Sequence, residues 1–167
     1  GLYMLTDQVK GEFWEDAGFL EDGNLYKGID HSANFASTFE GEPKTTWHDG
    51  YEKKEGAPDD WSDLDTFVAF VSESEDAAFD AGLGDIVALE EMYDWWILAL
   101  VFSAYDTIGK NAYFYNDPVG LSFRFVPWDF NHSLGQTWRT AREPATDDWT
   151  FTDTNNLFAR ILASEVH

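Results

Sequence analysis

The sequence predicts an α+β fold, because helix-like and strand-like patterns alternate along a chain of 167 residues. Apolar side chains recur at helical spacing over about 60–72 and 86–104, which indicates two helices. Two β-prone runs follow, 112–116 and 121–126, and the second alternates apolar with polar residues as a strand does. Hydrophobic residues make up 44% of the chain and aromatic residues 17%. This content supports one domain with its own core and argues against disorder.

Short elements separated by turn signals make up the first third of the chain. Asp22-Gly23-Asn24 is a typical turn, and residues 56–60 contain Gly56 and Pro58 and form a second break. Around these breaks we expect a strand over 2–6, a short helix over 9–19, strands over 25–27 and 47–53, and a loop with at most one strand over 29–46.

Acidic residues mark the predicted starts of the two long helices. Asp60 is a typical N-cap for the first helix, and Asp85 is expected to cap the second. Between these helices, residues 77–81 are expected to form a short turn that Gly82–Gly84 ends. The second helix is apolar on most of its sides, which indicates a central and buried position.

A hairpin is predicted after the second helix. Asp117-Pro118-Val119-Gly120 joins the strands over 112–116 and 121–126 and contains typical turn residues. Residues 127–153 lack a regular pattern, and Asn155 or Asn156 is expected to start a final helix.

The formal net charge of −22 excludes several classes of function. A surface this acidic repels nucleic acid and anionic lipid. The longest strictly apolar run, Trp95 to Phe102, is too short to cross a bilayer, and no signal peptide is visible. Such an acidic excess is typical of a high-salt environment or of carboxylates that bind multivalent cations, and the sequence leaves both explanations open. The chain has no cysteine, so it has neither a disulfide nor a zinc-thiolate site.

The order of polar residues around the hairpin indicates phosphotransfer chemistry. Asn111 follows Asp106 by five residues, the hairpin comes next, and Asp129 opens an Asp-Phe-Asn segment. In protein kinases an Asp and an Asn with this spacing accept the hydroxyl proton and bind a metal ion, and a second Asp after a hairpin binds the metal that bridges the phosphates. Asp106 also lies at the C-terminal end of a long helix, where the macrodipole disfavours negative charge. A chemical role would explain its position there.

Other interpretations of these residues exist. Asp106 is equally well a solvated loop residue, Asn111 a turn residue, and Asp129 the cap of a turn. His31, His48 and His132 show no metal-ligand spacing. His132 is close to Asp129, so it either lines the site or is an incidental loop histidine, and we favour the second interpretation.

The chain resembles the spore-coat CotH kinase family, which consists of secreted or surface-associated atypical protein kinases. The most specific part is Pro127-Trp128-Asp129 after Lys110-Asn111-Ala112-Tyr113. The matching stretches occur in the family's order and are residues 1–9, 23–28, 51–54, 106–115 and 125–131, followed by Gly135. The chain opens with what resembles the middle of a strand, so we expect the natural protein to extend upstream.

The resemblance implies an atypical protein-kinase fold with an incomplete N-terminal lobe. About 1–58 would form part of that lobe, and about 59–167 a helical C-terminal lobe with the catalytic hairpin. Asp106 falls on the position of the catalytic aspartate and Asp129 on that of the metal-binding aspartate. The cofactors implied are ATP and Mg²⁺ or Mn²⁺. The chain departs from the family at Asp7, where Glu is usual, and at Asn131, where a second Asp is usual. Asn131 still offers a carbonyl oxygen to a metal.

Further site residues are predicted from their types and places. Lys27, on a strand, is expected to reach the phosphates of ATP, although an exposed strand lysine is the alternative. Glu52 is expected to pair with that lysine. Lys110 lies beside Asp106 and would neutralise the transferring phosphate; the alternative is a loop charge that offsets the local acidity. Asn111 would share metal binding with Asp129.

The expected function is ATP-dependent phosphorylation of Ser or Thr on a protein substrate, at an extracellular or spore-surface location. Two other functions fit the same residues. One is a binding module that holds a surface or carbohydrate ligand on a degenerate kinase fold. The other is a metal-dependent phosphohydrolase that uses the same aspartates on water.

Overall fold

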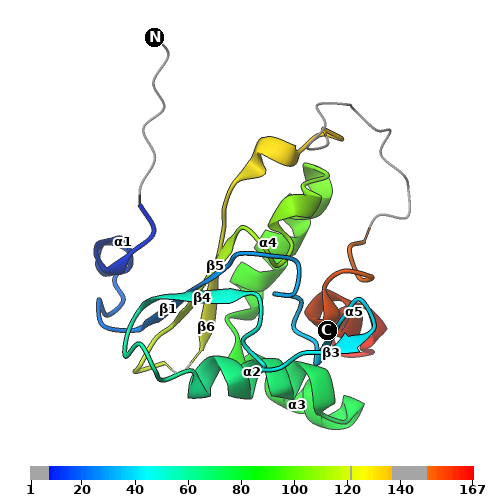
Figure 1. The fold of residues 1–167 in the computed structure, drawn as a ribbon, viewed down its shortest axis with the longest axis horizontal. Helices are drawn as coiled ribbons and strands as arrows, with labels where there is room; N and C mark the ends of the chain where they lie inside the picture. Colours follow the sequence, from blue (N-terminus) through cyan, green and yellow to red (C-terminus); the bar gives the residue numbers. More distant parts are fainter. Residues whose placement is uncertain (1–7, 121, 137–149) are drawn as a thin grey trace.

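A four-stranded antiparallel sheet positions the rest of the chain, with the strand order β4-β1-β5-β6 (Figure 1). The computed structural model describes residues 8–120, 122–136 and 150–167. The strand predicted over 2–6 and part of the irregular stretch 127–153 therefore lie outside the described residues. The strands are β1 (Asn24–Gly28), β4 (Tyr51–Glu55), β5 (Ala112–Asn116) and β6 (Phe123–Pro127).

Strand β1 lies between strands that come from distant parts of the sequence. It pairs with β4 on one side and with β5 on the other. The sheet therefore takes strands from both predicted parts of the chain, 1–58 and 59–167. The predicted strands over 25–27 and 112–116 are confirmed as β1 and β5, while β4 and β6 begin a few residues later than expected.

Successive side chains of the strands enter two apolar clusters, as the two-residue period of a strand requires. On one face, Phe125 stacks on Trp95 of α4 (Leu89–Val101) with 5.4 Å between ring centroids. On the other face, Tyr115 stacks on Trp14 of α1 (Gly11–Asp16) at 4.3 Å. The larger cluster also includes α2 (Ser62–Glu73), whose Phe67 is buried.

A second, two-stranded sheet lies within the region predicted as loop. Its strands β2 (Thr38–Phe39) and β3 (Glu42–Pro43) pair antiparallel. Glu40 and Gly41 join them, both with positive φ, which is the backbone of a tight type I′ hairpin turn.

The prediction for the region between the two long helices is wrong. In place of a short turn over 77–81, α3 runs from Asp76 to Ile86 and passes through Gly82–Gly84. Glycine disfavours a helix by about 1 kcal/mol relative to alanine, but Phe79 and Leu83 are buried in the core and hold this helix in place. Asp85 consequently lies inside α3 and does not cap the next helix.

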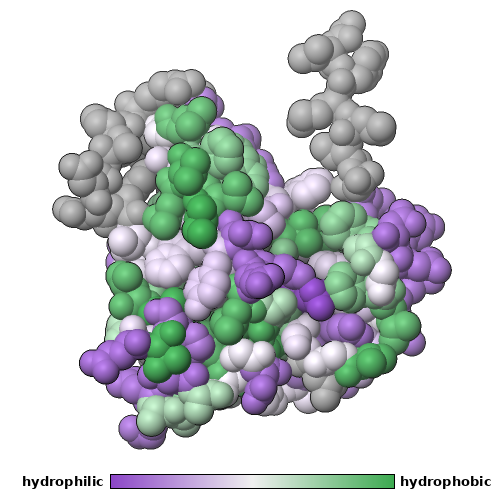
Figure 2. Space-filling view, turned by 180° about the vertical axis from the view of Figure 1, so that it is seen from behind, coloured by the Kyte–Doolittle hydropathy of each residue, from purple (hydrophilic) through white to green (hydrophobic). Residues whose placement is uncertain are grey.

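Helix α4 begins later than predicted and is not buried on most sides. It starts after Ala88, whose N–H donates to the Phe123 carbonyl of β6 at 2.9 Å. Met92, Trp95 and Ala99 face the core, whereas the opposite side is exposed, because α4 lies against the sheet with one face only. The exposed apolar residues there are Ile97, Leu98, Val101 and Phe102. Figure 2 shows an apolar area over the C-terminal part of α4.

The starts of α2 and α5 agree better with the sequence. Helix α2 begins at Ser62, and the Asp60 carboxylate accepts from the N–H of Ser62 at 3.1 Å. Helix α5 (Asn156–Ala163) is capped by Asn155, whose side chain accepts from Phe158 N. Among the described residues, the helices are too short or too polar to cross a membrane.

Candidate active site

Asp106 lies where the chain leaves the C-terminal end of α4. It belongs to the short 3-10 helix η1 (Tyr105–Thr107), and only 8% of its surface is exposed. Burial of a charged group is costly unless hydrogen-bond donors compensate it. Two segments of the chain provide these donors.

Three donor groups surround the Asp106 carboxylate. Lys110 Nζ lies 3.0 Å from Oδ1, and Asn111 Nδ2 donates to Oδ2 at 2.9 Å. His132 Nδ1 lies 3.3 Å from the same Oδ2. Lys110 and Asn111 follow Asp106 in one loop, whereas His132 comes from the 3-10 helix η2 (Phe130–His132). Contacts of this kind fix the orientation of the carboxylate.

Buried side chains hold the loop 106–111 from the core side. Thr107 is fully buried, and its carbonyl accepts from Trp95 Nε1 of α4 at 2.6 Å. The Thr107 hydroxyl donates to the Asn111 carbonyl at 2.9 Å. Asn155, the cap of α5, donates to the Ile108 carbonyl at 2.5 Å. Two helices therefore anchor the loop that carries Asp106.

The same loop packs directly on strand β1. Asn111 N donates to the Gly28 carbonyl at 2.9 Å. A Cβ at Gly28 would lie 2.0 Å from the Gly109 carbonyl oxygen, and one at Gly109 would lie 2.2 Å from the Ala33 carbonyl oxygen. Both distances are too short for a side chain, so this close backbone approach requires glycine at the two positions.

Asn111 and Asp129 share an uncommon backbone conformation. Their φ angles are 57° and 60°, in the left-handed region. Asn and Asp enter that region more readily than other residues with a side chain. Residues held in this way concentrate at functional sites because the surrounding structure must enforce them.

Asp129 is brought to the loop by the end of the hairpin. The N–H of Trp128 donates to the Asn111 carbonyl at 2.8 Å and lies 3.3 Å from the Thr107 hydroxyl. Helices η1 and η2 are in contact. Asp129 and Asn131 are both exposed, so the structure places accessible oxygen atoms next to the element that carries the buried Asp106.

The donor set is suited to magnesium bound together with phosphate. Within residues 8–120, 122–136 and 150–167, no group of three or more His, Asp or Glu side chains forms a complete cage for a metal ion. Mg²⁺ is usually bound by one or two carboxylates together with water and substrate phosphates. The exposed carboxylate of Asp129 and the amide oxygen of Asn131 fit that pattern.

Lys27 and Glu52 lie beside each other in the sheet, but each contacts a side chain other than the predicted partner. The two residues are in register on β1 and β4. Lys27 Nζ lies 5.3 Å from the centre of the Tyr113 ring, whereas Glu52 forms an ion pair with Lys54 at 2.8 Å. Tyr113 in turn contacts Trp128 edge-to-face. Lys27 thus contacts Tyr113, which contacts Trp128, the residue before Asp129. Glu52 lies on the edge strand β4.

Sequence reasoning undervalued His132 and missed Thr107. The structure places His132 on Asp106, although its pattern indicated an incidental loop residue. Its position three residues after Asp129 was the available signal, because a short turn there points back toward the same site. Thr107 offered no signal, since its role depends on a hydrogen bond across the loop.

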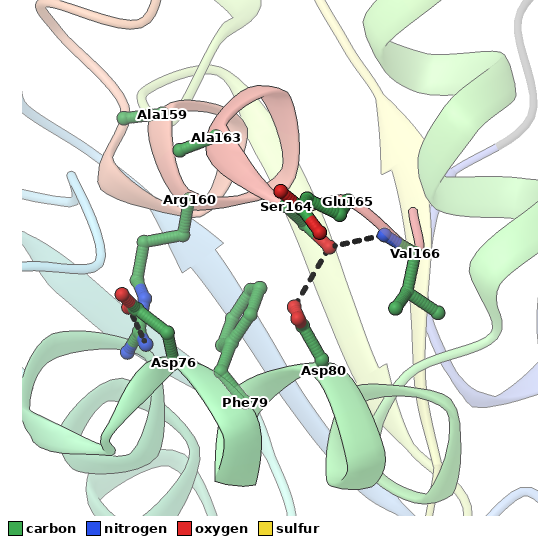
Figure 3. Close-up of a pocket in the computed structure, with 9 residues that line it drawn as sticks. All are labelled: Asp76, Phe79, Asp80, Ala159, Arg160, Ala163, Ser164, Glu165 and Val166. Carbon is green, nitrogen blue, oxygen red and sulfur yellow. Dashed lines mark hydrogen bonds and ion pairs between the residues drawn. The ribbon is translucent and has the colours of Figure 1, made fainter.

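One cavity of about 340 Å³ borders the candidate site at Lys110. Polar side chains of Asn34, Glu40 and Asp153 also line it. A cavity of about 450 Å³ between α3 and α5 shares no lining residue with it. There Arg160 pairs with Asp76, and Ser164 donates to Asp80 (Figure 3). These contacts join two helices away from Asp106.

The fold mixes helix and sheet, and along the chain a buried Asp, an Asn five residues later, a hairpin and an exposed second Asp follow one another in the order that protein kinases use. Residues 1–166 match the family described as CotH kinase protein, and the chain belongs to this family. It is 30% identical over 165 residues to the inner spore coat protein H of Bacillus subtilis (strain 168). This match covers 97% of the chain and 45% of that relative, so the chain spans less than half of the relative's length.

Proposed function

We propose that this chain carries an ATP- and divalent-metal-dependent site that transfers phosphate to Ser or Thr of a protein substrate. The observation that carries the proposal is the Asp106 carboxylate, buried and oriented by Lys110, Asn111 and His132. A carboxylate anchored by two helices and by strand β1 has the fixed geometry that general-base catalysis needs. The family name supports the same chemistry.

Each side chain has a place in this proposal. Asp106 orients the acceptor hydroxyl and receives its proton. Lys110 lies between Asp106 and the adjoining cavity, where its charge would neutralise the transferring phosphate. Asp129, Asn131 and the side-chain oxygen of Asn111 would hold Mg²⁺ or Mn²⁺. When bound, the metal neutralises charge on the β- and γ-phosphates.

The nucleotide and the location belong to the proposal as well. Lys27 would contact ATP phosphates from strand β1, close to the loop that Gly28 holds. Glu52, on the neighbouring edge strand β4, would assist Lys27 in binding the nucleotide. The relative from Bacillus subtilis is named as an inner spore coat protein, and we propose a spore-surface or extracellular location for this chain.

Transfer of label from ATP tests the proposal against its alternatives. The natural protein that contains this chain is incubated with Mg²⁺, γ-labelled ATP and dephosphorylated casein as a general Ser and Thr acceptor. We expect metal-dependent label on Ser or Thr, either of casein or of the protein itself. Label released only as free phosphate would indicate a phosphohydrolase, and ATP left intact would indicate a binding module. Either result contradicts the proposal.

Matched variants locate the activity. Asp106→Asn is expected to remove label transfer. Asp85→Asn changes an exposed carboxylate inside α3 and is expected to keep the wild-type rate. If label transfer fell equally in both variants, the loss would follow from the change in total charge and not from the site.

A further inference from the structure

His132 is a side chain of η2 that reaches the Asp106 carboxylate. It is partly enclosed, since 23% of its side chain and 11% of that of Asp106 are exposed. The other two partners of the carboxylate come from the loop that follows Asp106. Among the described residues, His132 therefore forms the polar side-chain contact between the segment bearing Asp129 and the Asp106 carboxylate.

The partners are distributed unequally over the two carboxylate oxygens. Oδ2 receives Asn111 Nδ2 at 2.9 Å and His132 Nδ1 at 3.3 Å, whereas Oδ1 receives Lys110 Nζ at 3.0 Å. A carboxylate offers about four acceptor positions. Two contacts on Oδ2 and one on Oδ1 leave one position, on Oδ1, for the hydroxyl of a substrate.

The imidazole must donate for this contact to be favourable. An ionised carboxylate only accepts hydrogen bonds, so the contact of 3.3 Å between Nδ1 and Oδ2 is favourable in the form of the ring that carries a hydrogen on Nδ1. Rotation of the carboxylate about its Cβ–Cγ bond would break the contacts with Asn111 and His132 together. The pair therefore limits that rotation more than either donor alone.

We infer that His132 is a positioning residue: its Nδ1–H, together with Asn111, holds Oδ2 so that Oδ1 faces the acceptor hydroxyl. This inference rests on the proposed function. His132 itself moves no proton in it. The contact also keeps η2, and with it Asp129, at a fixed place relative to Asp106.

Two substitutions separate positioning from a structural role. His132→Phe keeps a planar ring and removes the donor. In His132→Asn the side-chain amide replaces the Nδ1 donor. With casein and Mg²⁺-ATP, we expect His132→Phe to lower kcat by about 10- to 100-fold, the size of a misplacement effect, with KM for ATP and Tm close to wild type. His132→Asn should recover most of kcat. His167→Phe, at the junction of α3 and α5, is the matched control and should keep kcat.

A wild-type kcat in His132→Phe would overturn the inference. A loss of kcat in His132→Asn as large as that in His132→Phe would also overturn it. A second readout does not depend on catalysis. The ¹³Cγ resonance of Asp106, assigned by its absence in Asp106→Asn, should move in His132→Phe and return toward wild type in His132→Asn at the same pH. If the wild type transfers no phosphate, the proposed function fails, and an unchanged resonance in His132→Phe then overturns the positioning role separately.

Discussion

The ammonium group of Lys44 is buried and makes no hydrogen bond with the described residues. Burial lowers the pKa of this lysine to about 8, although Asp49 and Asp30 oppose the shift. Asp49 does not serve as its partner, because its carboxylate accepts hydrogen bonds from Thr45 and Thr46. Those bonds lower the pKa of Asp49 to about 2. Burial thus shifts the pKa of Lys44, whereas hydrogen bonds from neighbouring threonines shift that of Asp49.

A pH dependence of stability follows from Lys44. Its pKa is lower in the folded chain than in the unfolded chain, so the unfolded state binds more protons between about pH 8 and the ordinary lysine pKa of about 10.4. Its contribution to the free energy of unfolding therefore rises with pH in that window. We expect Lys44→Met to raise Tm at pH 7. Between pH 8 and 9.5, the increase of Tm with pH should be smaller in this variant than in the wild type. An identical pH profile in both proteins, measured by thermal unfolding, would contradict this.

Asp106 and His132 show what a sequence reveals at the scale of one residue. The spacing of Asp106, Asn111 and Asp129 was readable because it lies within one stretch of chain. The contact with His132 depends on how η2 folds back, and the pairing of Glu52 with Lys54 depends on side-chain conformations. The sequence placed His132 near Asp129, but neither contact follows from the spacing of residues alone.

The close packing of strand β1 on the loop 106–111 is the main element-scale feature of the candidate site. Gly28 permits this packing, because a Cβ there would lie 2.0 Å from the Gly109 carbonyl oxygen. The same strand carries Lys27 and pairs with β5, the first strand of the hairpin that leads to Asp129. A shift of β1 relative to the loop would therefore change several site residues together.

Gly28→Ala is expected to damage the site and the fold at once. Overpacking of this kind costs about 1–3 kcal/mol, and relief requires the loop 106–111 to move. We expect a lower Tm and a loss of label transfer larger than the loss of folded protein, both measured on the same sample. Gly84→Ala, in α3 where the nearest atom is the tip of Leu89 at 3.3 Å, is the control and should keep transfer. Full transfer by Gly28→Ala would show that the loop tolerates displacement.

Elements with strong local signals were predicted correctly from the sequence. Strands β1 and β5 and the Asn155 cap of α5 have clear turn or capping residues beside them. Helix α3 was missed because its glycines suggested a break, while tertiary packing of Phe79 and Leu83 determined the outcome. The exposed side of α4 was missed because an apolar pattern does not tell which side meets the core.

At the scale of the whole molecule, net charge is the dominant electrostatic feature. With −22 on 167 residues, like charges repel one another in the folded state. Salt screens such repulsion, with a Debye length of about 10 Å at 0.1 M. We expect Tm to rise on addition of sodium chloride and of millimolar Mg²⁺. A Tm that stays flat across both titrations would remove this explanation of the acidic composition.

The central claim is that Asp106 and Asp129 have different parts in one phosphotransfer site, and calorimetry of Mg²⁺-ATP binding on two variants tests it most directly. The natural protein containing this chain is compared with Asp106→Asn and Asp129→Asn, and label transfer is measured on the same samples. Both substitutions conserve size, and circular dichroism checks the fold. Asp106→Asn should bind Mg²⁺-ATP like wild type while transfer falls by about 10²–10⁴-fold, the usual contribution of a general base. Asp129→Asn should lose metal-dependent binding and transfer together. Wild-type transfer by Asp106→Asn, or unchanged metal dependence of ATP binding in Asp129→Asn, would contradict the claim.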